Sequence, residues 1–262
     1  MDYVRDLRRA NLVGATIVRR RNCIITLACW VEPRRLDHVT GNDIQAMLDH
    51  RGLSPRTRYH WISHIHAFYS WAVRHGRLPL DPTTLLPRPK LPKLLPRPIC
   101  DADLAVSLDC SHGHLHAWIA LASFCGLRCA EIAGLDAADI LDGGHLIRVY
   151  GKGSKERIVP LHTVAAEALG NAGARRSGPI WPTAPTPAEV SKQIATYHRG
   201  LGIDATAHQL RHWYGTKLYQ ATRDLRLVQE MMGHASPNTT AGYAAFDQST
   251  ARAAVEKIGL PT

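Results

Sequence analysis

Four side chains near the C-terminus could together carry out chemistry on a phosphate ester. They are His208, Arg211, His234 and Tyr243. His208 and Arg211 are three residues apart, so they share one face if their segment is helical. A guanidinium and two imidazoles can hold phosphate oxygens, and a phenolate can attack phosphorus. The pattern therefore predicts a phosphodiester site with Tyr243 as its nucleophile.

Two upstream segments supply the second cation and the proton donor that such a reaction would still lack. Arg128 lies in CGLRCAEIAGL, which predicts a helix, a break at a glycine and a second short helix. Lys152 lies in YGKGSKER, between strand-like runs at residues 145–150 and 157–161. Two strands joined by a glycine-rich connection predict a β-hairpin with Lys152 at or near its tip.

Each of these residues also has a plainer interpretation. A lone arginine is usually in a surface or interdomain ion pair. A lysine in a turn, such as Lys152 or its neighbour Lys155, is usually solvated. His112, His114 and His116 suggest a metal site by their spacing, but no acidic or cysteine partner lies nearby, so we expect no metal.

Six residues in order, Arg128, Lys152, His208, Arg211, His234 and Tyr243, resemble those of the tyrosine recombinase family, which includes phage integrases and Xer-type recombinases. The segments GLRCAEIAGL, GKGSKERIVPL, HQLRH and MMGHASPNTTAGY carry this resemblance, which covers essentially the whole chain. It implies that Arg128 and Arg211 hold the scissile phosphate and that Lys152, rather than Lys155, is the general acid. It further implies a supporting role for Glu131, which would orient Arg128 or His208.

The resemblance also implies an activity. Tyr243 would cut duplex DNA at a specific site and form a 3′-phosphotyrosyl link, with no metal, ATP or other cofactor. A tetramer on DNA would complete strand exchange, with directionality or accessory proteins as further partners. The run WYGT after HQLRH favours a phage or mobile-element integrase over an Xer-type resolvase of chromosome or plasmid dimers. An inactive DNA-binding regulator and a type IB topoisomerase-like enzyme are the remaining alternatives.

The positive charge of the chain is concentrated in its first third. Residues 1–98 hold 17 Lys and Arg against 7 Asp and Glu, whereas residues 99–262 hold 15 of each. A basic module joined to a neutral one indicates that the first grips the DNA backbone. The candidate DNA contacts are Arg19, Arg20, Arg21, Arg56, Arg58, Arg88, Lys90 and Lys93.

The pattern of residues predicts two domains and a linker. We expect a helical core-type DNA-binding domain at residues 1–78 and a proline-rich basic linker at 79–98, where seven of twenty residues are proline. The catalytic domain would span residues 99–262 and end in a tail helix at about 247–258. The predicted fold class is mainly α with a small β-sheet (α+β). With no membrane segment or signal peptide, we expect a cytoplasmic, nucleoid-associated protein.

Overall fold

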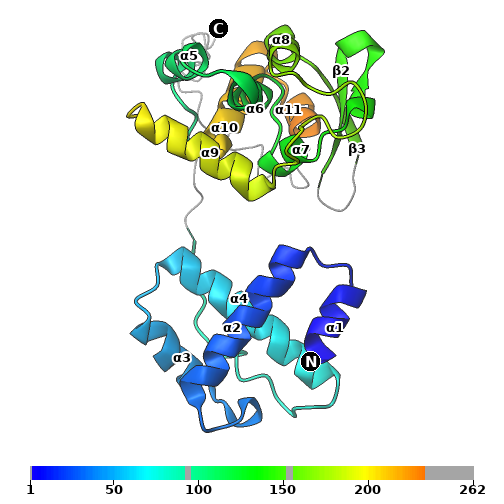
Figure 1. Ribbon diagram of the computed structural model, residues 1–262. Coiled ribbons are helices and arrows are strands. Elements are labelled where there is room, and N and C mark those ends of the chain that lie inside the picture. The colour runs from blue at the N-terminus through cyan, green and yellow to red at the C-terminus, as the bar shows by residue number, and fades with distance from the viewer. Residues whose placement is uncertain (1, 92–95, 152–155, 234–262) are drawn as a thin grey trace, which may run out of the picture. The chain divides into compact units, whose positions relative to one another are not determined.

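The computed structural model describes residues 2–91, 96–151 and 156–233, and the chain divides into two compact units, Met1–Lys93 and Leu94–Thr262 (Figure 1). Four predicted residues, Lys93, Lys152, His234 and Tyr243, lie outside the described residues, as does the predicted tail helix. Among the helices of the described ranges, none combines the length and the apolar character needed to span a membrane.

The first unit is a helical bundle, as predicted. Its helices are α1 (Asp2–Arg9), α2 (Gly14–Val31), η1 (Leu36–His38), α3 (Gly41–His50) and α4 (Pro55–Arg74). In Figure 1, α2 crosses α4, and the two pack around a core that includes Leu27, Ile44, Leu48, Ile62 and Ile65, all fully buried.

Side-chain caps set the starts of two of these helices. Thr40 and Asp43 form a capping box at the start of α3, and Ser54 caps α4 just before Pro55. The sequence pattern did not predict α1. This helix contributes little to the hydrophobic core, because its buried residues are only Tyr3 and Leu7. Both belong to a small cluster that includes Trp71 of α4.

Part of the proline-rich segment packs against the first unit. The Asp81 carboxylate accepts hydrogen bonds from Ser70 of α4 at 2.9 Å and from the Thr83 hydroxyl at 2.6 Å. Leu86 is buried in the core of the first unit. The first half of the expected linker therefore belongs, by its contacts, to the first unit.

The second unit is built around α6 (Gly113–Phe124). Seven consecutive residues of α6, from Ala117 to Ser123, are buried. Figure 1 shows the surrounding helices, and α8, α9 and α10 all pack on α6. The other helices in the described part of this unit are α5 (Asp101–Asp109), α7 (Cys129–Ala133), η2 (Ala137–Asp139), η3 (Asp142–Gly144), α8 (Thr163–Asn171), α9 (Pro187–Gly200), α10 (Ala207–Thr222) and α11 (Leu225–Met232).

A small antiparallel sheet completes the second unit. Its strands β1 (Ile140–Leu141), β2 (Leu146–Tyr150) and β3 (Glu156–Pro160) lie in that order. Tyr150 pairs with Glu156 at the end of the β2–β3 ladder, so the predicted hairpin is confirmed. Its connection contains Lys152. The α+β class predicted from the sequence is confirmed as well.

Candidate active site

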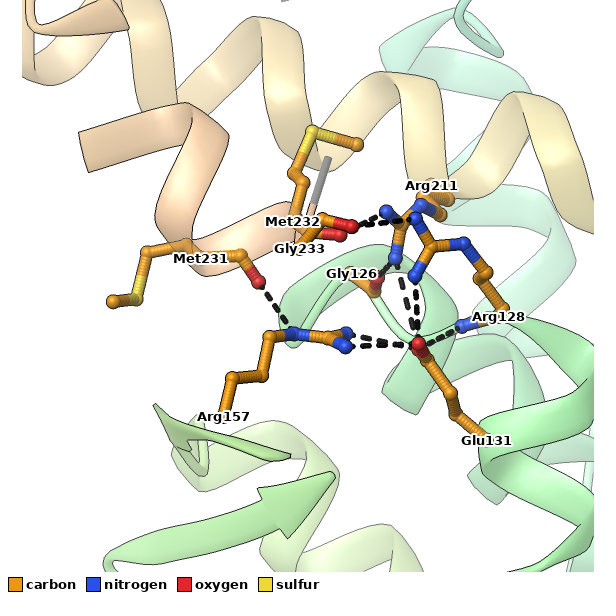
Figure 2. A network of polar contacts seen from close by, with 8 residues as sticks. All are labelled: Gly126, Arg128, Glu131, Arg157, Arg211, Met231, Met232 and Gly233. Atoms are coloured by element: carbon orange, nitrogen blue, oxygen red, sulfur yellow. Dashed lines mark hydrogen bonds and ion pairs between the residues drawn. The ribbon is translucent and has the colours of Figure 1, made fainter. Parts of the chain in front are cut away.

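Three of the six predicted catalytic residues lie within the described chain, on two elements of the second unit. Arg128 is the N-cap residue of α7, and His208 and Arg211 lie in the first half of α10. Figure 2 shows Arg128 and Arg211 converging on the carboxylate of Glu131. The other three, Lys152, His234 and Tyr243, stay predictions from the sequence.

A glycine break positions Arg128. Gly126 has a φ of +65°, a left-handed conformation that separates α6 from α7. Leu127 then turns into the core, and Arg128 begins α7. Glu131 Oε2 accepts a hydrogen bond from the backbone N–H of Arg128 at 2.7 Å. Glu131 Oε1 accepts one from Arg128 Nη1, also at 2.7 Å. The local sequence therefore fixes the backbone and the guanidinium of Arg128 together.

Glu131 is the centre of the cluster, and its side chain is only 2% exposed. Besides the hydrogen bonds from Arg128, its carboxylate accepts hydrogen bonds from both terminal nitrogens of Arg157, at 2.8 and 2.9 Å. It also forms an ion pair with Arg211 Nη1 at 3.7 Å. Burial by itself would raise the pKa of the Glu131 carboxyl. The hydrogen bonds and charge of Arg157, with the Arg128 amide and the Arg211 charge, outweigh burial and hold that pKa below its ordinary value.

Arg211 is buried, whereas Arg128 is partly open to solvent. The Arg211 side chain is 4% exposed and donates to the carbonyl oxygens of Gly126 and Met232. The Arg128 side chain is 38% exposed. Three guanidinium groups around one carboxylate leave an excess of positive charge, which attracts an anion and disfavours a metal cation. A phosphate that reaches this site would meet Arg128 first.

His208 lies beside the arginine cluster. Partial desolvation by the surrounding protein and the positive charges of Arg211 and Arg128 lower its pKa, which favours the neutral imidazole. Its ring centroid is 4.1 Å from that of His212, one helical turn later. Burial, with His208 and Arg211 nearby, lowers the pKa of His212 to about 4. A neutral His208 can accept a proton, so it has the protonation state that a general base needs.

Two functional contacts did not emerge from the sequence pattern. The contacts of Arg157 with described residues are distant in sequence, and the one with Glu131 spans 26 residues. His212 is one residue after Arg211, but the i, i+4 spacing from His208 places the two rings together. That spacing is a signal available in the sequence, whereas the partner of Arg157 depends on the tertiary fold.

Two of the three histidines considered for a metal have other contacts. His114 packs edge-on against Trp181, with ring centroids 5.6 Å apart. His116 Nδ1 lies 2.9 Å from the hydroxyl of Ser111. These side chains serve packing and local hydrogen bonding.

The candidate DNA-contact residues lie at or near the surface of the first unit. Arg19 and Arg21 of α2, Arg56 of α4, and Arg88 and Lys90 of the proline-rich segment are exposed, whereas Arg20 and Arg58 are half-buried. Arg58 is paired with Asp49 at 2.8 Å. Lys93 lies outside the described residues. The exposed members present positive charge that a phosphate backbone could reach.

Replacing Gly126 with alanine should destabilise the second unit by about 3 kcal/mol. The added Cβ would clash with the Tyr214 ring, 2.7 Å from Cε1, and alanine would also be strained at a φ of +65°. Gly202→Ala is the matched control, since it has a φ of +73° and no atom within 4 Å of the added Cβ. The control should lose only about 1 kcal/mol in urea unfolding. Equal losses for the two variants would contradict the close packing on Tyr214.

Comparisons with known proteins identify the family of the chain. Residues 99–250 match the family model described as the phage integrase family. The chain is 34% identical over 215 residues to the tyrosine recombinase XerC of Myxococcus xanthus, covering 72% of this chain and 71% of that protein. It is also 30% identical to the integrase from mycobacterium phage Brujita, with a TM-score of 0.50 and coverage of 96% of this chain and 89% of that one.

A solved structure supports the fold over most of the chain. The site-specific recombinase XerH bound to difH substrate, in its post-cleavage complex, superposes with a TM-score of 0.75 at 20% identity. The match covers 94% of this chain and 81% of that one. With its arginines gathered on α7 and α10 and its sequence matched across residues 99–250, the chain belongs to the phage integrase family of tyrosine recombinases, enzymes that cut and rejoin DNA strands.

Proposed function

We propose that this chain cuts duplex DNA by attack of the Tyr243 hydroxyl on a scissile phosphate held by Arg128 and Arg211. One observation carries the proposal. Two arginines from separate elements, α7 and α10, meet at the buried Glu131 with an excess of positive charge. Such an arrangement supports a phosphate whose transition state carries additional negative charge.

The proposed reaction is a transesterification, in which one phosphoester bond forms as another breaks. The Tyr243 oxygen bonds to phosphorus as its proton passes to His208, and the 5′-oxygen of the next nucleotide leaves with a proton from Lys152. His234 would donate a hydrogen bond to the phosphate. The products are a 3′-phosphotyrosyl link and a free 5′-hydroxyl. Because the new ester stores the energy of the broken one, a 5′-hydroxyl from a partner duplex can reverse the step without ATP.

The first unit would grip the DNA backbone through its excess of positive charge. The described DNA-contact candidates that are exposed are Arg19, Arg21, Arg56, Arg88 and Lys90. Strand exchange between two duplexes needs four active sites, so we propose a tetramer on DNA. A solved lambda integrase described as a tetramer bound to a Holliday junction shares the fold, with a TM-score of 0.71 at 17% identity.

We propose integration and excision of a phage or mobile element as the biological role. The Brujita phage integrase, which aligns over 96% of this chain, supports it. The XerC relatives at 34% identity support the alternative, resolution of chromosome or plasmid dimers. Recombination between two unlike attachment sites would favour the first role, and recombination only between two copies of one site would favour the second.

Covalent trapping tests the proposed chemistry without knowledge of the recognition site. The substrate is a library of random duplexes, each nicked near its centre. Cleavage close to the nick releases a short fragment that carries the 5′-hydroxyl, and once this fragment diffuses away the phosphotyrosyl link cannot be reversed. We expect wild-type protein to form an adduct that survives denaturing electrophoresis, and the trapped DNA to share one sequence. Failure to trap any DNA, with the folded protein binding the same library, would contradict the proposal.

A further inference from the structure

Three consecutive carbonyl groups at the C-terminal end of α11 each accept a hydrogen bond from a different arginine. Arg157 Nε donates to Met231 O at 3.0 Å, Arg211 Nη2 donates to Met232 O, and Arg128 Nη2 donates to Gly233 O at 3.0 Å (Figure 2). The last carbonyls of a helix have no partners within the helix and carry partial negative charge. The arginine cluster therefore also caps α11.

Arg157 is more buried than Arg128. It lies on β3 with a side chain 11% exposed, compared with 38% for Arg128. Both of its terminal nitrogens are bound to Glu131, and its Nε is bound to Met231 O. All three nitrogens of the Arg157 guanidinium thus make contacts within the protein.

The end of α11 fits closely against Arg157. Gly233 adopts a φ of +60°, and a Cβ at this position would lie 3.0 Å from Arg157 Nη1 and 3.1 Å from its Cδ. A helix end this close to a buried side chain cannot shift without moving that side chain. Arg157 is therefore the side chain that joins β3, Glu131 and the end of α11.

We propose that Arg157 is a positioning residue for strand cleavage, which holds Glu131 and the end of α11 so that Arg128 and Arg211 face the scissile phosphate. This inference rests on the proposed roles of Arg128 and Arg211. Glu131 has room for about four hydrogen bonds, and Arg157 supplies two of those it accepts. Without them, the buried carboxylate draws Arg128 and Arg211 inward or takes up a proton.

The central experiment compares cleavage rates of Arg157→Met and wild type on the nicked duplex, at saturating DNA. We expect Arg157→Met to cleave roughly 10²-fold more slowly, the scale of a misplaced catalytic group, while its affinity for DNA is unchanged. Arg148→Met is the matched control, because Arg148 lies on the adjacent strand β2 and contacts Glu156 rather than Glu131. The control should cleave at the wild-type rate.

Two further readouts separate positioning from a general structural role. Arg157→Met combined with Glu131→Gln should lose less cleavage rate than the product of the two single losses, because part of the effect of Arg157 acts through Glu131. In Arg157→Met the cleavage rate should also fall further than in wild type as the pH is lowered into the acid range, because wild type loses rate there only by protonation of His208. The further fall arises because loss of Arg157 raises the pKa of Glu131, which the arginine holds down in wild type.

Either of two results overturns the inference: cleavage by Arg157→Met at the wild-type rate, or losses that multiply in the double variant. If Arg157→Met is unfolded at the assay temperature, Arg157→Lys decides, since it keeps the charge but loses the planar fork. A slower rate for Arg157→Lys supports the inference, and the wild-type rate overturns it. Absence of any wild-type adduct would instead count against the proposed function, so the two failures are distinguishable.

Discussion

Replacing Tyr243 with phenylalanine should abolish covalent trapping on nicked DNA while leaving DNA binding unchanged. The phenol oxygen is the atom that bonds to phosphorus, and phenylalanine keeps the ring but has no nucleophile. No other group can take over the step, because water attack at the same site would give cleaved DNA without a protein link. The measurement is the yield of adduct on a denaturing gel, with binding followed separately by a gel shift.

Tyr150→Phe is the matched control for this substitution. Tyr150 is 49% exposed at the end of β2, and its hydroxyl lies 3.5 Å from Arg148 Nη1. It is thus an accessible phenol in the same unit that the proposal does not use. The control should trap DNA as well as wild type. An adduct that persists in Tyr243→Phe and disappears in Tyr150→Phe would show that the nucleophile had been assigned wrongly.

Replacing Arg211 with alanine should slow the cleavage step by about 10³-fold at saturating DNA. The guanidinium would stabilise charge that develops on the phosphate only in the transition state, so the loss should appear in the rate of cleavage rather than in DNA affinity. Arg226→Ala is the control. It removes an arginine from α11 whose side chain is 80% exposed and paired with Glu230, and it should leave the rate unchanged.

The same substitution should also reduce stability, because Arg211 is buried against Glu131 and two carbonyl groups. Removing one partner of a buried ion pair costs about 3–5 kcal/mol. Arg211→Lys keeps the charge and should be less destabilised. A lysine nevertheless lacks the planar guanidinium, whose two terminal nitrogens donate to Gly126 O and Met232 O. If folded Arg211→Lys cleaved at the wild-type rate, the planar guanidinium of Arg211 would not be needed for cleavage, which would contradict the role given to it here.

Local signals in the sequence were sufficient to predict much of the fold. Thr40, Ser54 and Thr186 cap helices where the sequence predicts starts, and prolines follow two of them. The glycine-rich connection correctly predicted the β2–β3 hairpin. By residue type Thr222 could also cap α11, but Asp224 is the cap, because its carboxylate accepts hydrogen bonds from the amides of both Arg226 and Leu227.

The geometry of the site was harder to predict, because its contacts are distant in sequence. The Arg128–Glu131 pair is local, and a three-residue spacing indicates it. The contacts of Arg157 with Glu131 and Met231 span 26 and 74 residues, and that of Arg211 with Gly126 spans 85. Such contacts depend on how β3, α10 and α11 pack around α7, which hydrophobic periodicity alone does not specify.

The central claim is that Arg128 and Arg211 stabilise the charge of a scissile phosphate. A substrate in which a methyl group replaces one nonbridging oxygen of that phosphate is neutral at the reacting centre, so it tests this claim directly. We predict that Arg128→Ala and Arg211→Ala lose about 10³-fold in cleavage rate on the phosphodiester but much less on the neutral substrate. Equal losses on the two substrates would contradict the claim, because they would show that the arginines act through something other than the phosphate charge.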